Sequence, residues 1–144
     1  MRLLTALCLA AAPAAHAWDF TADPICTIWH GTDSAEMVVT YDPARAVPYA
    51  ISVTLADRTW PDTAPYAIRF DGPRGFVIST DRHVLSDDGA AVIASDTGFE
   101  NVLKGLEANI VASPLLGNMA VAIPLSDAAP AVAKFRDCTV TGLS

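Results

Sequence analysis

The feature that most constrains the fold of this chain is a pair of cysteines, Cys26 and Cys138, near opposite ends of the 144-residue sequence. Apart from Cys8, which lies in the leader described next, they are the only cysteines, and an even number in an exported chain indicates a disulfide. Redox pairs hold their cysteines two residues apart, whereas these are 112 positions apart. The sequence therefore predicts a structural bond that closes the chain end to end. The chain-entropy model gives it at most about 4–5 kcal/mol of stabilisation.

Residues 1–17 have the pattern of a secretory signal peptide. Arg2 supplies a positive start, residues 3–12 are apolar, and residues 15–17 read Ala-His-Ala, a small-x-small cleavage pattern. The apolar run has about half of the roughly 20 residues that span a bilayer, so we do not expect a membrane anchor. Lipid attachment at Cys8 is not expected either, because Leu7 precedes it where a small residue is needed. The alternative, the start of a buried helix, fits this opening less well.

Cleavage after Ala17 would leave residues 18–144, a chain of 127 residues and a comfortable length for a single domain. The full chain carries a formal net charge of −7, and loss of Arg2 leaves 8 basic against 16 acidic side chains, a net charge of −8. Such a surface repels DNA, RNA and anionic lipid, which are polyanions. It favours solubility or a cationic partner. The oligomeric state is left open.

Period-two patterns predict a mainly β domain. The cleanest alternation runs over residues 49–55, where Ile51, Val53 and Leu55 point one way and two polar side chains point the other. Turn residues separate it from further expected strands at residues 25–30, 36–41, 67–70, 76–80, 83–85, 91–94, 110–112 and 119–123. Residues 66–93 are expected to form a meander, and residues 18–24 a lead-in without a strand. The fold class is mainly β (α+β): an antiparallel sandwich or barrel of about eight strands with two short helices.

The two helices are predicted from period-3.6 patterns. The first is amphipathic, is capped by Asp96 or Thr97, and presents one face made of Phe99, Val102, Leu103 and Leu106. Pro114 and Gly117 mark a loop after it. The second helix runs from an N-cap at Ser126 to Cys138. Its Val132 and Phe135 are three positions apart and are expected to lie on the sheet.

The densest polar cluster consists of Asp81, Arg82, His83, Asp87 and Asp88. One interpretation is a set of turns in which aspartate and glycine serve the geometry of the backbone. The other is a small hydrolase or metal site that uses His83 with Asp81 or Asp87. The chain has no G-x-S-x-G, no phosphate loop and no EF-hand pattern, so the sequence assigns no catalytic residue, no metal site and no cofactor.

Four aromatic residues, Tyr41, Tyr49, Trp60 and Tyr66, flank the proline-containing loops. They could line a binding groove or pack the loops onto the core, and packing is the commoner use. Two histidines follow the leader, His30 at the end of an expected strand and His83 at the start of another. Each of them is compatible with a half-exposed polar position.

Two resemblances follow from longer stretches of sequence. The ending Ala-Ala-Pro-Ala-Val-Ala-Lys-Phe-Arg-Asp-Cys, residues 128–138, resembles the last helix of exported proteins of the invasion-associated locus B type, which implies a periplasmic β-rich domain. Across its length the chain is similar to short exported bacterial proteins, some of which borrow their name from the helicase component of excinuclease ABC. The segments concerned are residues 66–69, 70–75, 79–83, 85–87 and 98–103. That name implies a DNA helicase built around phosphate loops, but this acidic chain has no such loop, so the activity is not carried over. No functional residues are transferred from either resemblance.

The function expected from the sequence is that of a periplasmic or secreted, non-enzymatic binding or interaction module. Its partner would be another periplasmic protein or a small ligand. The net charge suggests one concrete form, an acidic inhibitor of a cationic hydrolase. The alternative is a small periplasmic hydrolase or metal-binding protein that uses His83 with Asp81 or Asp87.

Overall fold

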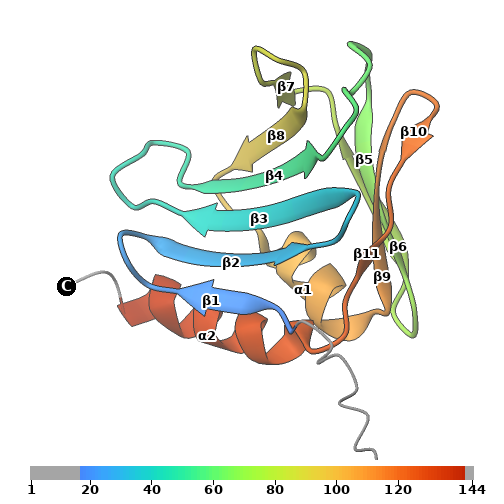
Figure 1. Ribbon diagram of the computed structural model, residues 1–144. Helices are drawn as coiled ribbons and strands as arrows, with labels where there is room; N and C mark the ends of the chain where they lie inside the picture. Colours follow the sequence, from blue (N-terminus) through green and yellow to red (C-terminus); the bar gives the residue numbers. More distant parts are fainter. Residues whose placement is uncertain (1–16, 142–144) are drawn as a thin grey trace, which may run out of the picture.

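Two antiparallel sheets that face each other form the body of the protein, as a computed structural model shows for residues 17–141 (Figure 1). The leader predicted for residues 1–17 lies, except for Ala17, outside the described residues. The described part has eight strands of three or more residues and three two-residue strands. In chain order they are β1 (Asp19–Thr21), β2 (Cys26–Gly31), β3 (Ala35–Tyr41), β4 (Tyr49–Leu55), β5 (Tyr66–Asp71), β6 (Phe76–Thr80), β7 (Val84–Leu85), β8 (Ala91–Asp96), β9 (Val111–Leu116), β10 (Met119–Ala120) and β11 (Ile123–Pro124).

The six-stranded sheet has the order β1-β2-β3-β4-β8-β7, and the strand with the cleanest alternation, β4, lies inside it. Ile51, Val53 and Leu55 are buried, and their intervening residues are not. The five-stranded sheet has the order β10-β9-β5-β6, and β11 also pairs with β9. The core lies between the sheets, because each sheet turns its apolar face inward.

Two helices cover one end of the sandwich, as Figure 1 shows. α1 (Glu100–Ala108) buries Val102, Leu103 and Leu106, with Phe99 immediately before it, which confirms the predicted face. α2 (Ala128–Thr141) packs against α1, β1 and β2 and buries Val132 and Phe135 completely. These two side chains are pinned to the sheet as the sequence predicts.

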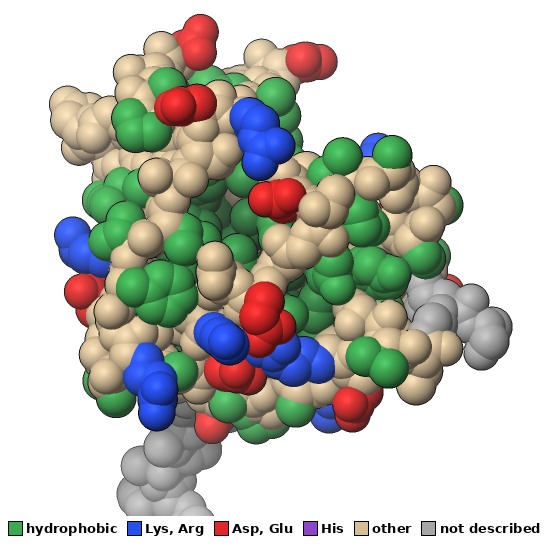
Figure 2. All heavy atoms as spheres, turned by 180° about the vertical axis from the view of Figure 1, so that it is seen from behind, with side chains coloured by type: hydrophobic (Ala, Val, Ile, Leu, Met, Phe, Trp, Pro, Cys, Tyr) green, Lys and Arg blue, Asp and Glu red, His purple; other side chains and the backbone are tan. Residues whose placement is uncertain are grey.

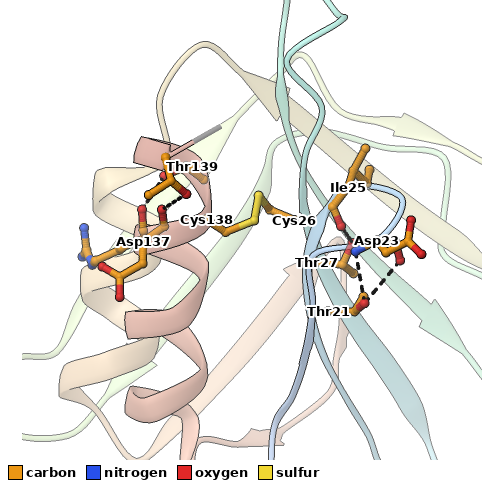
Figure 3. The surroundings of a disulfide bond; sticks show 10 residues. Thr21, Asp23, Ile25, Cys26, Thr27, Asp137, Cys138 and Thr139 are labelled. Atoms are coloured by element: carbon orange, nitrogen blue, oxygen red, sulfur yellow. Dashed lines mark hydrogen bonds between the residues drawn. A yellow bond between two sulfur atoms is a disulfide. The ribbon is translucent and has the colours of Figure 1, made fainter. Parts of the chain in front are cut away.

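The disulfide between Cys26 and Cys138 joins β2 to α2 and confirms the pairing inferred from the sequence (Figure 3). Both cysteines are buried. The prediction that the bond reaches the first strand needs one correction. The segment before β2 contains β1, whose residues 19–21 pair with residues 27–29 of β2. The mainly β class with two helices and one disulfide is therefore confirmed, and the two sheets do not close into a barrel.

The expected meander over residues 66–93 is wrong. β5 and β6 form a hairpin in the five-stranded sheet, whereas β7 and β8 belong to the six-stranded sheet. The chain crosses from one sheet to the other after Thr80. Local turn signals are the same for both kinds of connection, since the sheet that a strand joins depends on contacts far away in sequence.

The segment after α1 also differs from expectation. Pro114, assigned to a loop, lies within β9 opposite Ile68, and its carbonyl oxygen accepts a hydrogen bond from the Val121 backbone N–H at 3.2 Å. The strand expected over residues 119–123 is split into β10 and β11. A proline is tolerated in β9 because its backbone nitrogen points away from β5. The hydrogen bonds between β9 and β5 therefore lose no donor.

The helix starts differ from the predictions by a few residues. α1 follows Phe99, which makes no side-chain capping hydrogen bond; Asp96 instead accepts from the N–H of Thr97 at 2.7 Å. α2 begins at Ala128, after Asp127 with a φ of 58°, so Ser126 lies in the preceding turn. No helix among residues 17–141 has the length and apolar character to cross a membrane.

Candidate functional site

A cleft of about 200 Å³ opens between the two sheets, on the side where the sandwich is not closed. Figure 2, the view from behind, shows this hollow with hydrophobic side chains in its depth and charged groups near its rim. Its walls come from β4, β5, β6, β8 and the start of α1. The cleft is more enclosed than the depression beside His83 that is described below.

The cleft exists because two strand edges are left without partners. β6 is the last strand of its sheet. β8 is followed by β7, but β7 is only two residues long and pairs with Val92 and Ile93 alone. Residues 94–96 of β8 and residues 78–80 of β6 line the cleft from its two sides.

One wall of the cleft is apolar. Alternation along each strand places one row of side chains inward, and the start of α1 adds its own apolar face. Ile51 and Ile68 are 2% exposed, while Ile78 and Ala94 are half-buried near the opening. The apolar wall consists of Ile51, Ile68, Ile78, Ala94, Phe99 and Val102. Such a wall gains free energy when an apolar group covers it.

Tyr66 is the polar residue deepest in this wall. Its side chain is fully enclosed, with 2% of the residue exposed, and its hydroxyl has no hydrogen-bond partner among residues 17–141. Burial raises the pKa of Tyr66 above its ordinary value, so the phenol keeps its proton at neutral pH. An unpaired buried hydroxyl costs about 1–3 kcal/mol, and that cost ends when a partner group arrives.

The rim of the cleft carries one loose ion pair. An Nη2 atom of Arg82 lies 3.6 Å from Oδ2 of Asp96, and the two side chains are 76% and 48% exposed. A pair this exposed contributes little stability and separates at small cost. Both groups are thus free to contact a ligand at the entrance.

His83 lies behind the cleft wall rather than in it. Its Nε2 lies 2.8 Å from the carbonyl oxygen of Thr63 and donates to it, since a carbonyl can only accept. The other ring nitrogen, Nδ1, is buried and has no partner within the described residues. Neither nitrogen contacts a carboxylate in this part of the chain. His83 fastens the segment before β7 to the proline-containing loop.

The acidic residues predicted beside His83 serve a turn or lie on the surface. Oδ1 of Asp88 accepts from Ser86 Oγ at 2.7 Å and from the Ala90 N–H at 3.0 Å, and the Ser86 hydrogen bond is the main cause that lowers the pKa of Asp88. Asp87 and Asp88 border, with His83, a shallow depression separate from the cleft, whereas Asp81 is exposed and lines neither.

The predicted polar cluster is therefore divided between two places. Of its five residues, only Arg82 reaches the cleft. His30 is remote from both, buried in β2 with its ring stacked on Trp18 at a centroid distance of 5.5 Å. Within residues 17–141 no three His, Cys, Asp or Glu side chains are grouped so that they could hold a metal ion.

Sequence reasoning found part of the cleft and missed the rest. Tyr66 was among the aromatics that could line a groove, and it does line the cleft. Ser79 and Ser95 were missed, because only the assembly of the two sheets brings their strands to the same opening. Comparisons of the chain with family models, with curated proteins and with solved structures give no match.

Proposed function

We propose that this protein is an exported, non-enzymatic binding domain of the periplasm or the extracellular space, and that its binding site is the cleft between the two sheets. Export is supported by the signal-peptide pattern of residues 1–17 together with the disulfide. Disulfides persist in oxidising compartments and are rare in the cytosol of mesophiles.

The observation that carries this proposal is the buried Tyr66 hydroxyl, which has no hydrogen-bond partner among residues 17–141. Folded proteins satisfy most of their buried polar groups, so each exception needs a reason. A ligand that brings a hydrogen-bonding group to this hydroxyl supplies one. The apolar wall around Tyr66 would hold the rest of the ligand.

Binding accounts for the polar residues better than hydrolysis does. A histidine that acts as a general base is oriented by a second group and faces the substrate. The Nε2 of His83 is engaged with Thr63, its Nδ1 is enclosed, and the residue does not line the cleft. This arrangement supports a structural role for His83.

The proposal is tested by titrating the mature protein with benzene and with phenol while recording backbone amide NMR shifts. A six-membered ring suits this volume, because an engineered apolar cavity of about 150 Å³ binds benzene. We expect both probes to shift the amides of the cleft. Phenol should bind several-fold more tightly, because one good hydrogen bond to Tyr66 contributes about 0.5–1.5 kcal/mol.

Three variants sharpen this test. Tyr66→Phe should remove the preference for phenol and keep the binding of benzene. Ala94→Trp, which fills the cleft from its wall, should abolish both. Val47→Trp, on an exposed loop, is the control and should change neither. Shifts that are absent, or that survive in Ala94→Trp, would overturn the assignment of the cleft as the binding site.

A further inference from the structure

We infer that the natural occupant of the cleft is an extended segment of a basic partner protein. The segment adds as a new strand to the free edge of β6 and inserts one large apolar side chain between the sheets. This inference rests on the proposed function and names the class of ligand for the same site.

The volume of the cleft favours a side chain over a whole small molecule. Pockets for drug-sized ligands and cofactors measure about 300–1,000 Å³. The cleft measures about 200 Å³, which is enough for one ring or one branched aliphatic group. An occupant that inserts a single side chain must gain the rest of its affinity outside the cleft.

The edge of β6 offers main-chain hydrogen bonds for this purpose. Ile68 of β5 stands between Pro114 of β9 and Ile78 of β6. Pro114 has no N–H to donate, so Ile68 does not exchange a pair of main-chain hydrogen bonds with it. The N–H and C=O of Ile68 therefore point toward β6, where they bond to the C=O and N–H of Ile78. Because the direction alternates along a strand, the N–H and C=O of Val77 and Ser79 point to the open edge.

The opposite side of the cleft presents a second free main chain. The Ser86 N–H donates to the Ala91 carbonyl at 2.9 Å, so residues 91, 93 and 95 of β8 turn toward β7. β7 reaches only as far as Ile93, which leaves the N–H and C=O of Ser95 on the open side. Ser79 and Ser95 both line the cleft. Unpaired peptide groups on both sides of an apolar cleft are complementary to another main chain.

β6 is also the least protected edge in the described part of the chain. β1 is covered by α2, while β7 and β10, at two further edges, are two residues long. The five residues of β6 are Phe-Val-Ile-Ser-Thr, without a charge or a proline, and Val77 is 57% exposed. Natural edge strands are normally protected by a charged residue, a proline, short length or a covering element, unless they pair with a partner. In strand addition the main chain supplies affinity and a side-chain pocket supplies specificity.

Charge decides between a second copy of this chain and a different partner. Each copy without its leader carries a net charge of −8, so two copies repel each other. A segment with lysine or arginine beside its apolar anchor is attracted by the net negative charge of the domain as a whole, and Asp96 at the rim offers it one acidic contact. The inferred partner is therefore basic.

The first experiment selects peptides from a displayed library of random decapeptides on the mature, disulfide-intact protein, with counter-selection on Ala94→Trp. We expect enriched peptides to share one aromatic or large aliphatic residue with β-branched and basic neighbours. Amide hydrogen exchange at Val77 and Ser79 should slow at least tenfold in the complex. Failure to enrich any peptide would overturn the inference.

The second experiment removes one edge donor. Val77→Pro deletes an outward N–H at a residue that does not line the cleft, and it leaves the bonds between β5 and β6 intact, because those involve Phe76, Ile78 and Thr80. Peptide affinity should fall at least tenfold. Val77→Ala keeps the main chain and is the matched control, expected within twofold of wild type. The selected peptide is also made in two forms, each N-methylated at every second residue. Only the form whose methylated nitrogens face β6 should lose affinity, because alternate N–H groups of a strand point to opposite sides.

The outcomes separate this inference from the proposed function. Phenol should still bind to Val77→Pro, because Val77 does not line the cleft. Binding of phenol without enrichment of peptides would leave the cleft as a small-molecule site and overturn the inference alone. If neither phenol binding nor peptide enrichment is observed, the proposed function and this inference are both overturned. A dimer of this chain in sedimentation, abolished by Val77→Pro, would make a second copy the occupant and contradict a basic partner.

Discussion

The rings of Tyr66 and His83 lie with their centroids 5.8 Å apart, and each ring holds one buried polar atom that has no hydrogen-bond partner among residues 17–141. The Tyr66 ring belongs to the wall of the cleft, while the His83 ring is fastened to Thr63 on the other side. These two atoms are the buried side-chain nitrogen and oxygen atoms that lack a hydrogen-bond partner within the described residues, and they belong to adjacent rings. Of the two residues, only Tyr66 lines the cleft in which we propose that a ligand binds.

Removal of the Tyr66 hydroxyl should stabilise the protein. Tyr66→Phe keeps the ring and deletes a buried group that makes no hydrogen bond, so the free energy of unfolding should rise by about 1 kcal/mol. Urea unfolding at neutral pH measures this. Tyr49→Phe, at a half-buried tyrosine, is the control and should change stability by less than about 0.5 kcal/mol. A clear loss of stability in Tyr66→Phe would show that the hydroxyl is hydrogen-bonded in solution.

Stability should fall at alkaline pH because of the same residue. The folded pKa of Tyr66 lies above the unfolded value of about 10, so the unfolded chain releases this proton first. The free energy of unfolding is therefore not affected by the titration of Tyr66 below a pH of about 10, and it falls as the pH rises from there toward the folded pKa. Unfolding measured between pH 9 and 11.5 should show a decline that Tyr66→Phe lacks. The phenolate absorbance of Tyr66, taken as the difference between the wild type and Tyr66→Phe, should appear only above a pH of about 10.

Loss of the disulfide should cost stability without changing the fold. Cys26→Ser with Cys138→Ser releases a loop of 112 residues, for which chain entropy gives a loss of at most about 4–5 kcal/mol. Far-ultraviolet circular dichroism should be unchanged at low temperature, because both sheets are paired independently of the bond. Urea unfolding with and without a reductant gives the same comparison for the wild type. An unchanged midpoint would contradict a structural role.

Gly105 should tolerate no side chain. A Cβ there would lie 2.5 Å from Cε2 and Cζ of Phe70, a buried ring that cannot move aside freely. Gly105→Ala should therefore lower the free energy of unfolding by about 1–3 kcal/mol, even though alanine favours a helix. Gly98→Ala is the matched control, because nothing lies within 4 Å of its Cβ position. Equal effects of the two substitutions would contradict this packing.

Arg136 should tie the two helices together. It donates from Nη1 to Glu100 at 2.7 Å and from Nη2 to Glu107 at 3.1 Å. Arg136→Met should cost about 0.5–1 kcal/mol at low salt and less at 1 M salt, because Glu100 is more than half exposed. Arg45→Met, at an exposed pair of 3.9 Å, is the control and should cost almost nothing.

The same contact has a pH signature. The hydrogen bond from Arg136 lowers the pKa of Glu100 below its ordinary value. The stabilisation is therefore present above the unfolded pKa of about 4.3 and is lost as pH falls through the folded one. Acid unfolding of Arg136→Met should lack this part of the decline. A double-mutant cycle with Glu100→Gln isolates the coupling.

Several features could be predicted from the sequence because they are local or depend on few residues. The alternation at Ile51, Val53 and Leu55 fixes which face of β4 is buried, since side chains along a strand alternate between faces. The spacing of Val132 and Phe135 fixes the buried face of α2 in the same way. The disulfide followed from cysteine number alone.

The cleft and its free edges were decided only by the tertiary structure. Whether β6 and β8 join one sheet or two depends on pairings such as that of Tyr66 with Leu116, fifty positions away, which no local pattern encodes. Pro114 shows the same limit, because its effect depends on the direction in which Ile68 presents its peptide groups. The sequence by itself determined the strand and helix faces and the disulfide. The assembly of the sheets decided where they remain open, because an edge is free only when no distant strand pairs with it.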